Sequence, residues 1–255
     1  MKRLVAITLI IVVTTIGVLI LFGYQAFQTI VVKPKLLAVR ECTITPQPLT
    51  LDADKPSTEG TQLSQFGYTI TVPWIDKQKE YGTGNVTNVV FGGGQHVTLL
   101  DPEKYPDLLD EMNIYQHAQV TTEEQTKAKK LNRLFITMTH EEFYRRLLSA
   151  HPSGFSMFMS KREANQLKLF LVMKVDLLAN YSALYSFTDG ERRGFQLGNP
   201  QTDTRCEVLL FDSSNSPVHF WFSRESGSGT VTTQHNLDQI IKSFRWVRDK
   251  PNTKN

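Results

Sequence analysis

The sequence predicts an α+β fold in which an N-terminal transmembrane helix precedes one domain with an antiparallel sheet covered by helices. Three observations predict this fold. Residues 4–32 contain no charged side chain. Strand-like segments then precede a helix-rich middle, and a second group of strands precedes a closing helix, an order typical of the α+β class. With 40% hydrophobic and 21% charged residues, the chain can form a core but is too polar for a bundle of membrane spans.

The uncharged N-terminal run indicates a membrane anchor. Its core, Leu4 to Phe22, is almost continuously Leu, Ile and Val, and about 20 such residues span a hydrocarbon core of roughly 30 Å. A cleaved signal peptide has a shorter apolar region, about 7–15 residues, and a small-x-small cleavage site that is missing here. Tyr24 and Phe27 are typical of an interfacial aromatic pair. We expect an uncleaved signal-anchor that contacts the lipid bilayer through residues 4–32.

The charges flanking the anchor bear on orientation and on partners. Residues 1–35 hold Lys2, Arg3, Lys33 and Lys35 and no acid, which leaves 24 basic and 25 acidic residues in the rest of the chain. Because only three residues precede the span, we expect the N-terminus in the cytoplasm and an extracytoplasmic C-terminal domain on the cell membrane. The balanced remainder lacks the basic excess that a nucleic-acid partner requires.

The expected boundaries follow from composition. Residues 1–35 form the anchor and its flanks, residues 36–64 a tether and lead-in, residues 65–247 the globular domain and residues 248–255 a polar tail. One domain is sufficient for this length.

The first elements after the anchor are expected to be extended. Lys33-Pro34-Lys35 is expected to end the helix, and Leu36 to Ile44 is expected to be a strand or extended lead-in. The segment from Thr45 to Ser64 is expected to be loop around a short strand at Leu49 to Leu51.

Two further patterns predict strands in the first part of the domain. From Phe66 to Trp74 apolar residues occupy every second position, which predicts a strand with one buried face. Val86–Phe91 and His96–Leu100 flank three glycines and predict a β hairpin.

The middle of the chain is expected to be helical. Glu103 to Ile114 and a run that starts at Thr122 have helical composition. Thr139 with Glu142 and Ser160 with Glu163 match the capping box that begins a helix. The second box opens a run to about Asn180, and its wide apolar surface predicts a central, buried helix.

The last third is expected to return to strands, followed by a short helix at about Leu237 to Phe244. The expected strands are Ala183–Thr188, Gly194–Leu197, Cys206–Phe211 and Val218–Ser223.

Short stretches of this pattern resemble the edges of PsbP-like α/β/α sandwiches. They are Val72-Pro73-Trp74, the strand from Phe220 to Ser223 and the closing run from Ile240 to Phe244. The chain also resembles uncharacterised membrane-anchored bacterial proteins with a Val-Pro-Trp strand and a Phe-Met-Ser-Lys-Arg-Glu helix start. The first resemblance implies an extracytoplasmic accessory factor rather than an enzyme, and neither implies a site residue.

The two cysteines leave two alternatives open. Cys42 and Cys206 are 164 positions apart. They could form one long-range disulfide, which an extracytoplasmic compartment tolerates, or remain two buried thiols.

Motifs for catalysis fail a spacing test, so the catalytic residues stay unknown, and we predict no cofactor and no metal ion. In His140-Glu141-Glu142-Phe143-Tyr144 a Tyr replaces the second His of a zinc protease motif. Ser226-Gly227-Ser228-Gly229 has Arg224 where a hydrolase nucleophile turn needs Gly, and is expected to be a loop.

Two segments could instead bind a ligand. Gly92 to His96 is expected to form a turn, with an anion-binding loop as the alternative. Lys127, Lys129, Lys130 and Arg133 are expected on a solvated helix face, with anionic headgroups as alternative partners. His117, His151 and His219 are expected to pack or form hydrogen bonds.

The resulting hypothesis is a membrane-anchored extracytoplasmic module that binds or scaffolds an envelope protein partner. Whether the chain is an enzyme stays open, with a lean against it. The alternatives are an anchored hydrolase, which a cleft with convergent titratable groups would favour, and a small-ligand carrier, which an apolar pocket would favour.

Overall fold

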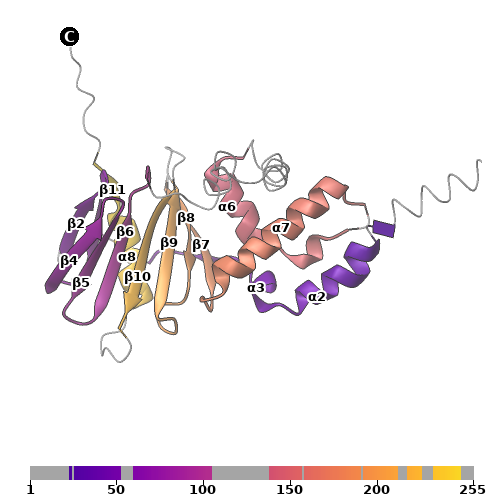
Figure 1. Cartoon of the computed structure of the whole chain (residues 1–255). Coiled ribbons are helices and arrows are strands. Elements are labelled where there is room, and N and C mark those ends of the chain that lie inside the picture. Colours follow the sequence, from indigo (N-terminus) through magenta and orange to yellow (C-terminus); the bar gives the residue numbers. More distant parts are fainter. Residues whose placement is uncertain are drawn as a thin grey trace, which may run out of the picture. The chain divides into compact units, whose positions relative to one another are not determined.

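The structure is a computed structural model of the whole chain (Figure 1). It describes residues 23–24, 26–52, 60–104, 138–156, 158–190, 192–211, 217–225 and 232–247. The chain divides into two compact units. The helical unit comprises residues 1–45 and 146–179, and the sheet unit comprises residues 46–145 and 180–255. The sequence predicts one globular domain over 65–247, whereas this division places residues 146–179 with the N-terminal segment.

The described residues contain no helix with the length and apolar character needed to cross a bilayer. The predicted membrane core, Leu4 to Phe22, lies outside these residues. The predicted helices at Glu103–Ile114 and after Thr122 also lie outside the described residues, except for Glu103 and Lys104, which form part of a turn.

The N-terminal part of the helical unit is helical where the sequence predicts an extended lead-in. A π-helix, η1 (Gln28–Val32), continues directly into α2 (Lys33–Leu37), and α3 (Arg40–Thr43) follows. Pro34 lies where η1 passes into α2, within this continuous helical stretch. The expectation that it ends the helix is wrong. The predicted strand from Leu36 to Ile44 is therefore wrong.

The second part of the helical unit contains η2 (Pro152–Gly154) and α7 (Lys161–Leu178). The predicted capping box of α7 is confirmed, because the Ser160 Oγ accepts from Glu163 N at 3.2 Å and Ser160 N donates to Glu163 Oε2 at 2.9 Å. The wide apolar surface of α7 predicts a buried helix, but the helix is buried on one face only. Val172 is 49% exposed, and the buried side chains occupy one face: Ala164, Phe170, Leu171, Lys174 and Leu178.

The sheet unit is built on an eight-stranded mixed sheet in the order β1-β7-β8-β9-β10-β6-β5-β4 (Figure 1). Its pairs are antiparallel, as predicted, except for the parallel pair β1–β7. The α+β class is confirmed, with a mixed rather than purely antiparallel sheet. The strands are β1 (Gln47–Leu49), β4 (Lys77–Thr83), β5 (Val86–Phe91), β6 (Gln95–Leu100), β7 (Leu184–Asp189), β8 (Arg192–Leu197), β9 (Arg205–Phe211) and β10 (Val218–Arg224).

The predicted hairpin of β5 and β6 is confirmed, and so are the four strands predicted in the last third. Strand β4 was not predicted, because none of its seven residues is buried and its sequence shows no apolar alternation. The predicted loop before residue 64 contains a further strand, β2 (Thr61–Gln65).

A smaller sheet and a helix cover one face of the large sheet. The small sheet has the order β11-β3-β2, with β3 at Tyr68–Val72 and β11 at Arg245–Trp246. The predicted strand from Phe66 begins only at Tyr68, because Phe66 has φ 51° and lies in the turn from β2. The closing helix, α8 (Gln234–Ser243), begins three residues before its predicted start, because the Thr233 Oγ1 caps it.

The main core lies between these layers. It combines residues of the large sheet with residues of β2, β3 and α8: Leu51, Leu63, Tyr68, Ile70, Val72, Val89, Phe91, Val97, Leu99, Phe187, Cys206, Val208, Leu210, Val218, Phe220, Phe222, Leu237, Ile240, Ile241 and Phe244. The opposite face of the large sheet carries His219 and Phe211, and Tyr144 of α6 (His140–Ser149) packs against both rings at centroid distances of 5.9 Å. The alternation of side chains along β9 and β10 separates these two faces.

Candidate functional site

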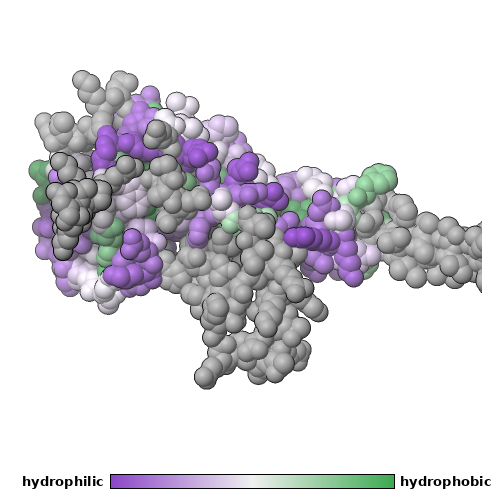
Figure 2. Space-filling view, turned by 90° about the horizontal axis from the view of Figure 1, so that it is seen from above, coloured by the Kyte–Doolittle hydropathy of each residue, from purple (hydrophilic) through white to green (hydrophobic). Residues whose placement is uncertain are grey.

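The surface of the helical unit carries most of the exposed large apolar side chains. Among the described residues nine such side chains are exposed, and six belong to this unit, which is the smaller of the two: Phe27, Ile30, Val31, Leu37, Phe158 and Val172. Figure 2 shows a mainly purple and white surface with green patches at the right and at the left of the view. Apolar side chains concentrated on one region indicate a contact with lipid or protein, whereas scattered ones need no explanation.

Helix α7 holds the N-terminal helix through polar contacts. The Tyr24 hydroxyl donates to Asn165 Oδ1 at 2.8 Å, and Lys161 Nζ lies 5.6 Å from the centroid of the Tyr24 ring. Farther along, Lys33 Nζ approaches the carbonyl oxygen of Ser153 at 3.5 Å. These contacts hold the start of α7 beside Tyr24, which follows the apolar core, Leu4 to Phe22, by two residues.

A buried lysine lies inside the helical unit. Lys174 is fully buried and donates to the carbonyl oxygen of Ala150 at 2.6 Å. Burial lowers the pKa of Lys174 to about 8, and the neighbouring Cys42 opposes that shift. Cys42 is also fully buried, and burial raises the pKa of its thiol.

The polar site of the sheet unit is a buried carboxylate on the face opposite the core. Glu207 Oε2 accepts from the Tyr181 hydroxyl at 2.9 Å, and Glu207 Oε1 lies 3.4 Å from His219 Nδ1. Arg205 Nη2 lies 3.9 Å from the same Oε2. Burial alone would raise the pKa of Glu207, but His219, Tyr181 and Arg205 hold it below its ordinary value. Glu207 is therefore a carboxylate at neutral pH.

Tyr181 and His219 are positioned by this carboxylate. Burial, reinforced by the charge of Glu207, raises the pKa of Tyr181, so its hydroxyl stays protonated and donates. The Nε2 atom of His219 is buried and has no hydrogen-bond partner among the described residues. An imidazole whose Nδ1 faces a carboxylate can accept or transfer a proton at Nε2, as in acid–base pairs of enzymes.

A stacked pair lies beside the carboxylate at the surface. The Arg205 guanidinium lies 4.0 Å from the centroid of the Trp221 ring, a favourable cation–π contact. The Arg205 side chain is 42% exposed. The stacked pair thus presents a planar cation to solvent next to Glu207.

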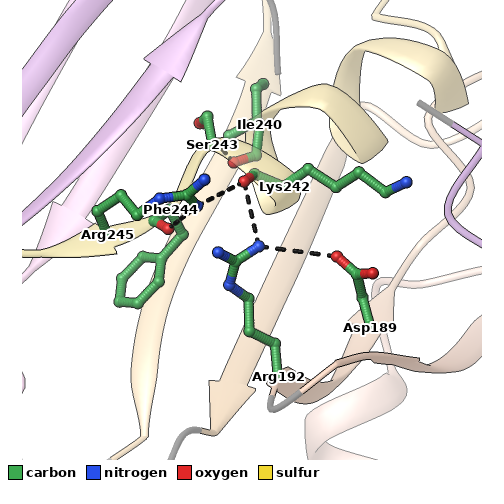
Figure 3. Close-up of polar contacts among 7 residues, drawn as sticks. All are labelled: Asp189, Arg192, Ile240, Lys242, Ser243, Phe244 and Arg245. Carbon is green, nitrogen blue, oxygen red and sulfur yellow. Dashed lines mark hydrogen bonds and ion pairs between the residues drawn. The ribbon is translucent and has the colours of Figure 1, made fainter. Parts of the chain in front are cut away.

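A second cluster of cations lies at the end of α8. Figure 3 shows Arg192 and Arg245 pointing at the carbonyl oxygen of Lys242, to which they donate at 3.1 Å and 2.8 Å. Asp189 lies 3.7 Å from the same Arg192 Nη1. The last carbonyls of a helix need such donors, and cations are favourable there, so this cluster caps α8. Burial and the charge of Arg245 lower the pKa of Arg192, with Asp189 opposing them.

The glycine-rich segment is a turn, as predicted. Gly94 has φ 76° and donates to the carbonyl oxygen of Phe91 at 3.0 Å, while Gly92 donates to that of Asp76 at 3.1 Å. His96 lies across from Glu225, with Nε2 and Oε1 3.2 Å apart. Two of the glycine amides are thus already bonded within the protein.

The other candidate residues have structural roles where they are described. Glu141 pairs with Arg193 at 3.1 Å, and the His151 Nδ1 accepts from Ser153 N at 3.1 Å at the start of η2. The basic cluster at Lys127 to Arg133, His117 and the loop from Ser226 to Gly229 lie outside the described residues. No three His, Cys, Asp or Glu side chains in the described ranges gather in a way that could hold a metal ion.

The two cysteines lie in different units. Cys42 of the helical unit and Cys206 of the sheet unit are each a buried free thiol. Burial raises the pKa of Cys206 to about 12.

Sequence reasoning missed the Glu207 site, because its members come from β9, β10 and the segment before β7. One signal was available. Glu207 interrupts an otherwise apolar run from Cys206 to Phe211, and a charge in a buried strand requires a partner.

Comparisons with known proteins give no match. No protein-family model matches the chain, and no match is found among curated proteins or solved structures. The resemblance to PsbP-like proteins stays a prediction.

Proposed function

We propose that this chain is a single-pass membrane protein whose sheet unit lies outside the cytoplasm and binds another component of the cell envelope. The anchor is the uncharged run at residues 4–32, and the sheet unit supplies the binding site. The protein is then an accessory or scaffold module rather than an enzyme.

The observation that carries this proposal is the apolar surface of the helical unit. Phe27 and Ile30 are 52% and 68% exposed, and both lie in the last part of the uncharged run, within the helical stretch from Ala26 to Leu37. A side chain of this size gains about 1.5–3 kcal/mol when it leaves water completely. Lys33 and Lys35 follow within the next turn. Exposed apolar residues followed by cations are typical of a helix that leaves a bilayer.

The anchor and its orientation can be tested on membranes that contain the full-length chain. We expect the protein to stay with the membrane at alkaline pH, which removes peripheral proteins. In sealed vesicles of known orientation, protease should cleave the sheet unit only where the extracytoplasmic face is outside. Extraction at alkaline pH, or cleavage only in vesicles with the opposite orientation, would overturn this part of the proposal.

Binding by the sheet unit is supported by the stacked pair beside Glu207. Arg205 and Trp221 combine a cation with an aromatic surface, and residues of these two types dominate many protein interfaces. Crosslinking in the native membrane, followed by purification in mild detergent, should recover a partner in near-stoichiometric amount. Arg205→Gln should reduce this recovery, and Arg193→Gln, which removes an arginine on β8, should not. Equal recovery with both variants would contradict the assignment of the site.

The Glu207–His219 pair favours a second candidate function, that of an anchored hydrolase. The supporting observation is that His219 Nε2 is buried and has no partner among the described residues. A screen with ester and phosphoester substrates would then detect activity that disappears in His219→Gln. The same activity should persist in His151→Gln, because His151 only caps η2. Activity that survives both substitutions would exclude His219 as the base.

A further inference from the structure

The most exposed large apolar side chain among the described residues is Phe158, at 90%. It lies in a tight turn before α7, where Phe158 N donates to Ser156 Oγ at 3.2 Å and Met159 N donates to the Ser156 carbonyl oxygen at 3.2 Å. The turn is therefore held by its own hydrogen bonds while the ring projects from it. Phe158 is one of the six exposed apolar side chains of the helical unit, and such a concentration indicates a contact with lipid or protein.

Contacts inside the helical unit place this turn near the end of the proposed span. Lys161 and Asn165 begin α7 directly after the turn, and both contact Tyr24. Tyr24 follows the apolar core, Leu4 to Phe22, by two residues. The start of α7 therefore lies beside the point where the proposed span leaves the hydrocarbon core.

The charges around the turn favour an anionic surface. Lys161 and Arg162 follow Phe158 within four residues. The nearby acid, Glu163, keeps its negative charge while its Oε2 accepts from Ser160 N. Lys161 and Arg162 therefore leave an excess of one positive charge over residues 161–163. A projecting aromatic ring next to cations is the combination by which peripheral segments bind anionic membranes.

We propose that the Phe158 turn is a second membrane contact, which inserts its ring into the bilayer interface where the N-terminal span emerges. Lys161 and Arg162 then face anionic headgroups. This inference rests on the proposed membrane anchor. It adds that the helical unit is held against the bilayer at two points, one through the span and one through the turn.

A fluorescent depth probe tests this contact in the full-length chain. The chain carries Phe158→Cys, is labelled with an environment-sensitive dye and is reconstituted into vesicles of phosphatidylcholine and phosphatidylglycerol. The native thiols should not react, because both are buried and their pKa values are raised. We expect a blue-shifted emission and about twofold quenching by lipids that carry a quencher near the headgroup.

A matched control separates the contact from insertion driven by the dye. Ile75 in the sheet unit is 79% exposed, so a dye at Ile75→Cys also replaces an exposed apolar side chain. We expect its emission to stay as in water. Vesicles without phosphatidylglycerol, or the double variant Lys161→Gln/Arg162→Gln, should reduce the quenching at residue 158.

The outcomes distinguish this inference from the anchor itself. A chain that does not stay with the vesicles at alkaline pH would overturn the proposed anchor. A chain that stays, but whose dye at residue 158 emits as in water, would overturn the second contact alone. Equal quenching at residues 75 and 158 would also overturn it, because the dye would then report no specific contact.

Discussion

Replacing Tyr181 by Phe tests how the carboxylate of Glu207 is held. The Tyr181 hydroxyl is 2.9 Å from Glu207 Oε2, and the next donor to that oxygen, on Arg205, is 3.9 Å away. The longer distance is outside the range of a hydrogen bond. The variant therefore leaves this oxygen buried without a hydrogen-bond donor among the described residues.

The expected cost follows from the charge of the acceptor. Hydrogen bonds to charged groups contribute about 1.5–3 kcal/mol, against about 1 kcal/mol for neutral pairs. Because Glu207 is ionised and buried, we expect Tyr181→Phe to lower the free energy of unfolding of the sheet unit by about 2 kcal/mol at pH 7. The pKa of Glu207 should rise in the variant, since one of the donors that lower it is removed.

Tryptophan emission during urea unfolding measures this change. The chain has three tryptophans, Trp74, Trp221 and Trp246, and all belong to the sheet unit. With a slope of about 2 kcal/mol per molar urea, the midpoint should fall by about 1 M. Tyr185→Phe is the control, because the structure gives its hydroxyl no hydrogen bond within the described chain. Equal midpoints for the two variants would refute the assigned hydrogen bond.

Three further predictions concern other positions. The lowered pKa of Glu207 stabilises the fold above the unfolded value of 4.5, and this stabilisation disappears as the pH falls through the folded pKa. Glu207→Gln should therefore remove this loss of stability on acidification. The helical unit should gain stability between pH 8 and 10.5, because Lys174 deprotonates first in the folded state; Lys174→Met should abolish this slope in far-ultraviolet circular dichroism. Gly194→Ala should cost about 1–3 kcal/mol in the urea assay, because its Cβ would overlap the carbonyl oxygen of Leu209, whereas Gly84→Ala should be close to neutral.

Local patterns were sufficient to predict the strands of the last third and the start of α7. In β9 five of the six residues from Cys206 to Phe211 are apolar, and in β10 four of the five from Val218 to Phe222 are apolar. At Ser160 the capping box is complete within four residues. Such signals depend only on neighbours in sequence. The helix near Pro34 was mispredicted because Pro34 lies where the π-helix η1 passes into α2, and its local sequence does not reveal a π-helix.

Long-range contacts explain what the sequence could not reveal. The partners of Glu207 are 12 and 26 residues away, at His219 and Tyr181, and nothing in their local sequence joins them. The apolar surface of α7 predicts burial but does not tell which part of the chain supplies it. The structure shows that the N-terminal helix is one contact, through Tyr24 and Asn165.

Strand β4 has a consequence under the proposed membrane anchor. It forms an outer edge of the large sheet, all seven of its residues are exposed, and its register shifts between Lys77 and Lys79. Edge strands can pair with a second chain, and charged side chains and bulges oppose such pairing. Copies that share one membrane surface meet far more often than copies free in solution, because confinement raises their effective concentration. The charges of β4 would thus keep crowded neighbours from joining edge to edge, and neutralising Lys77, Lys79 and Glu80 would promote clustering at high surface density.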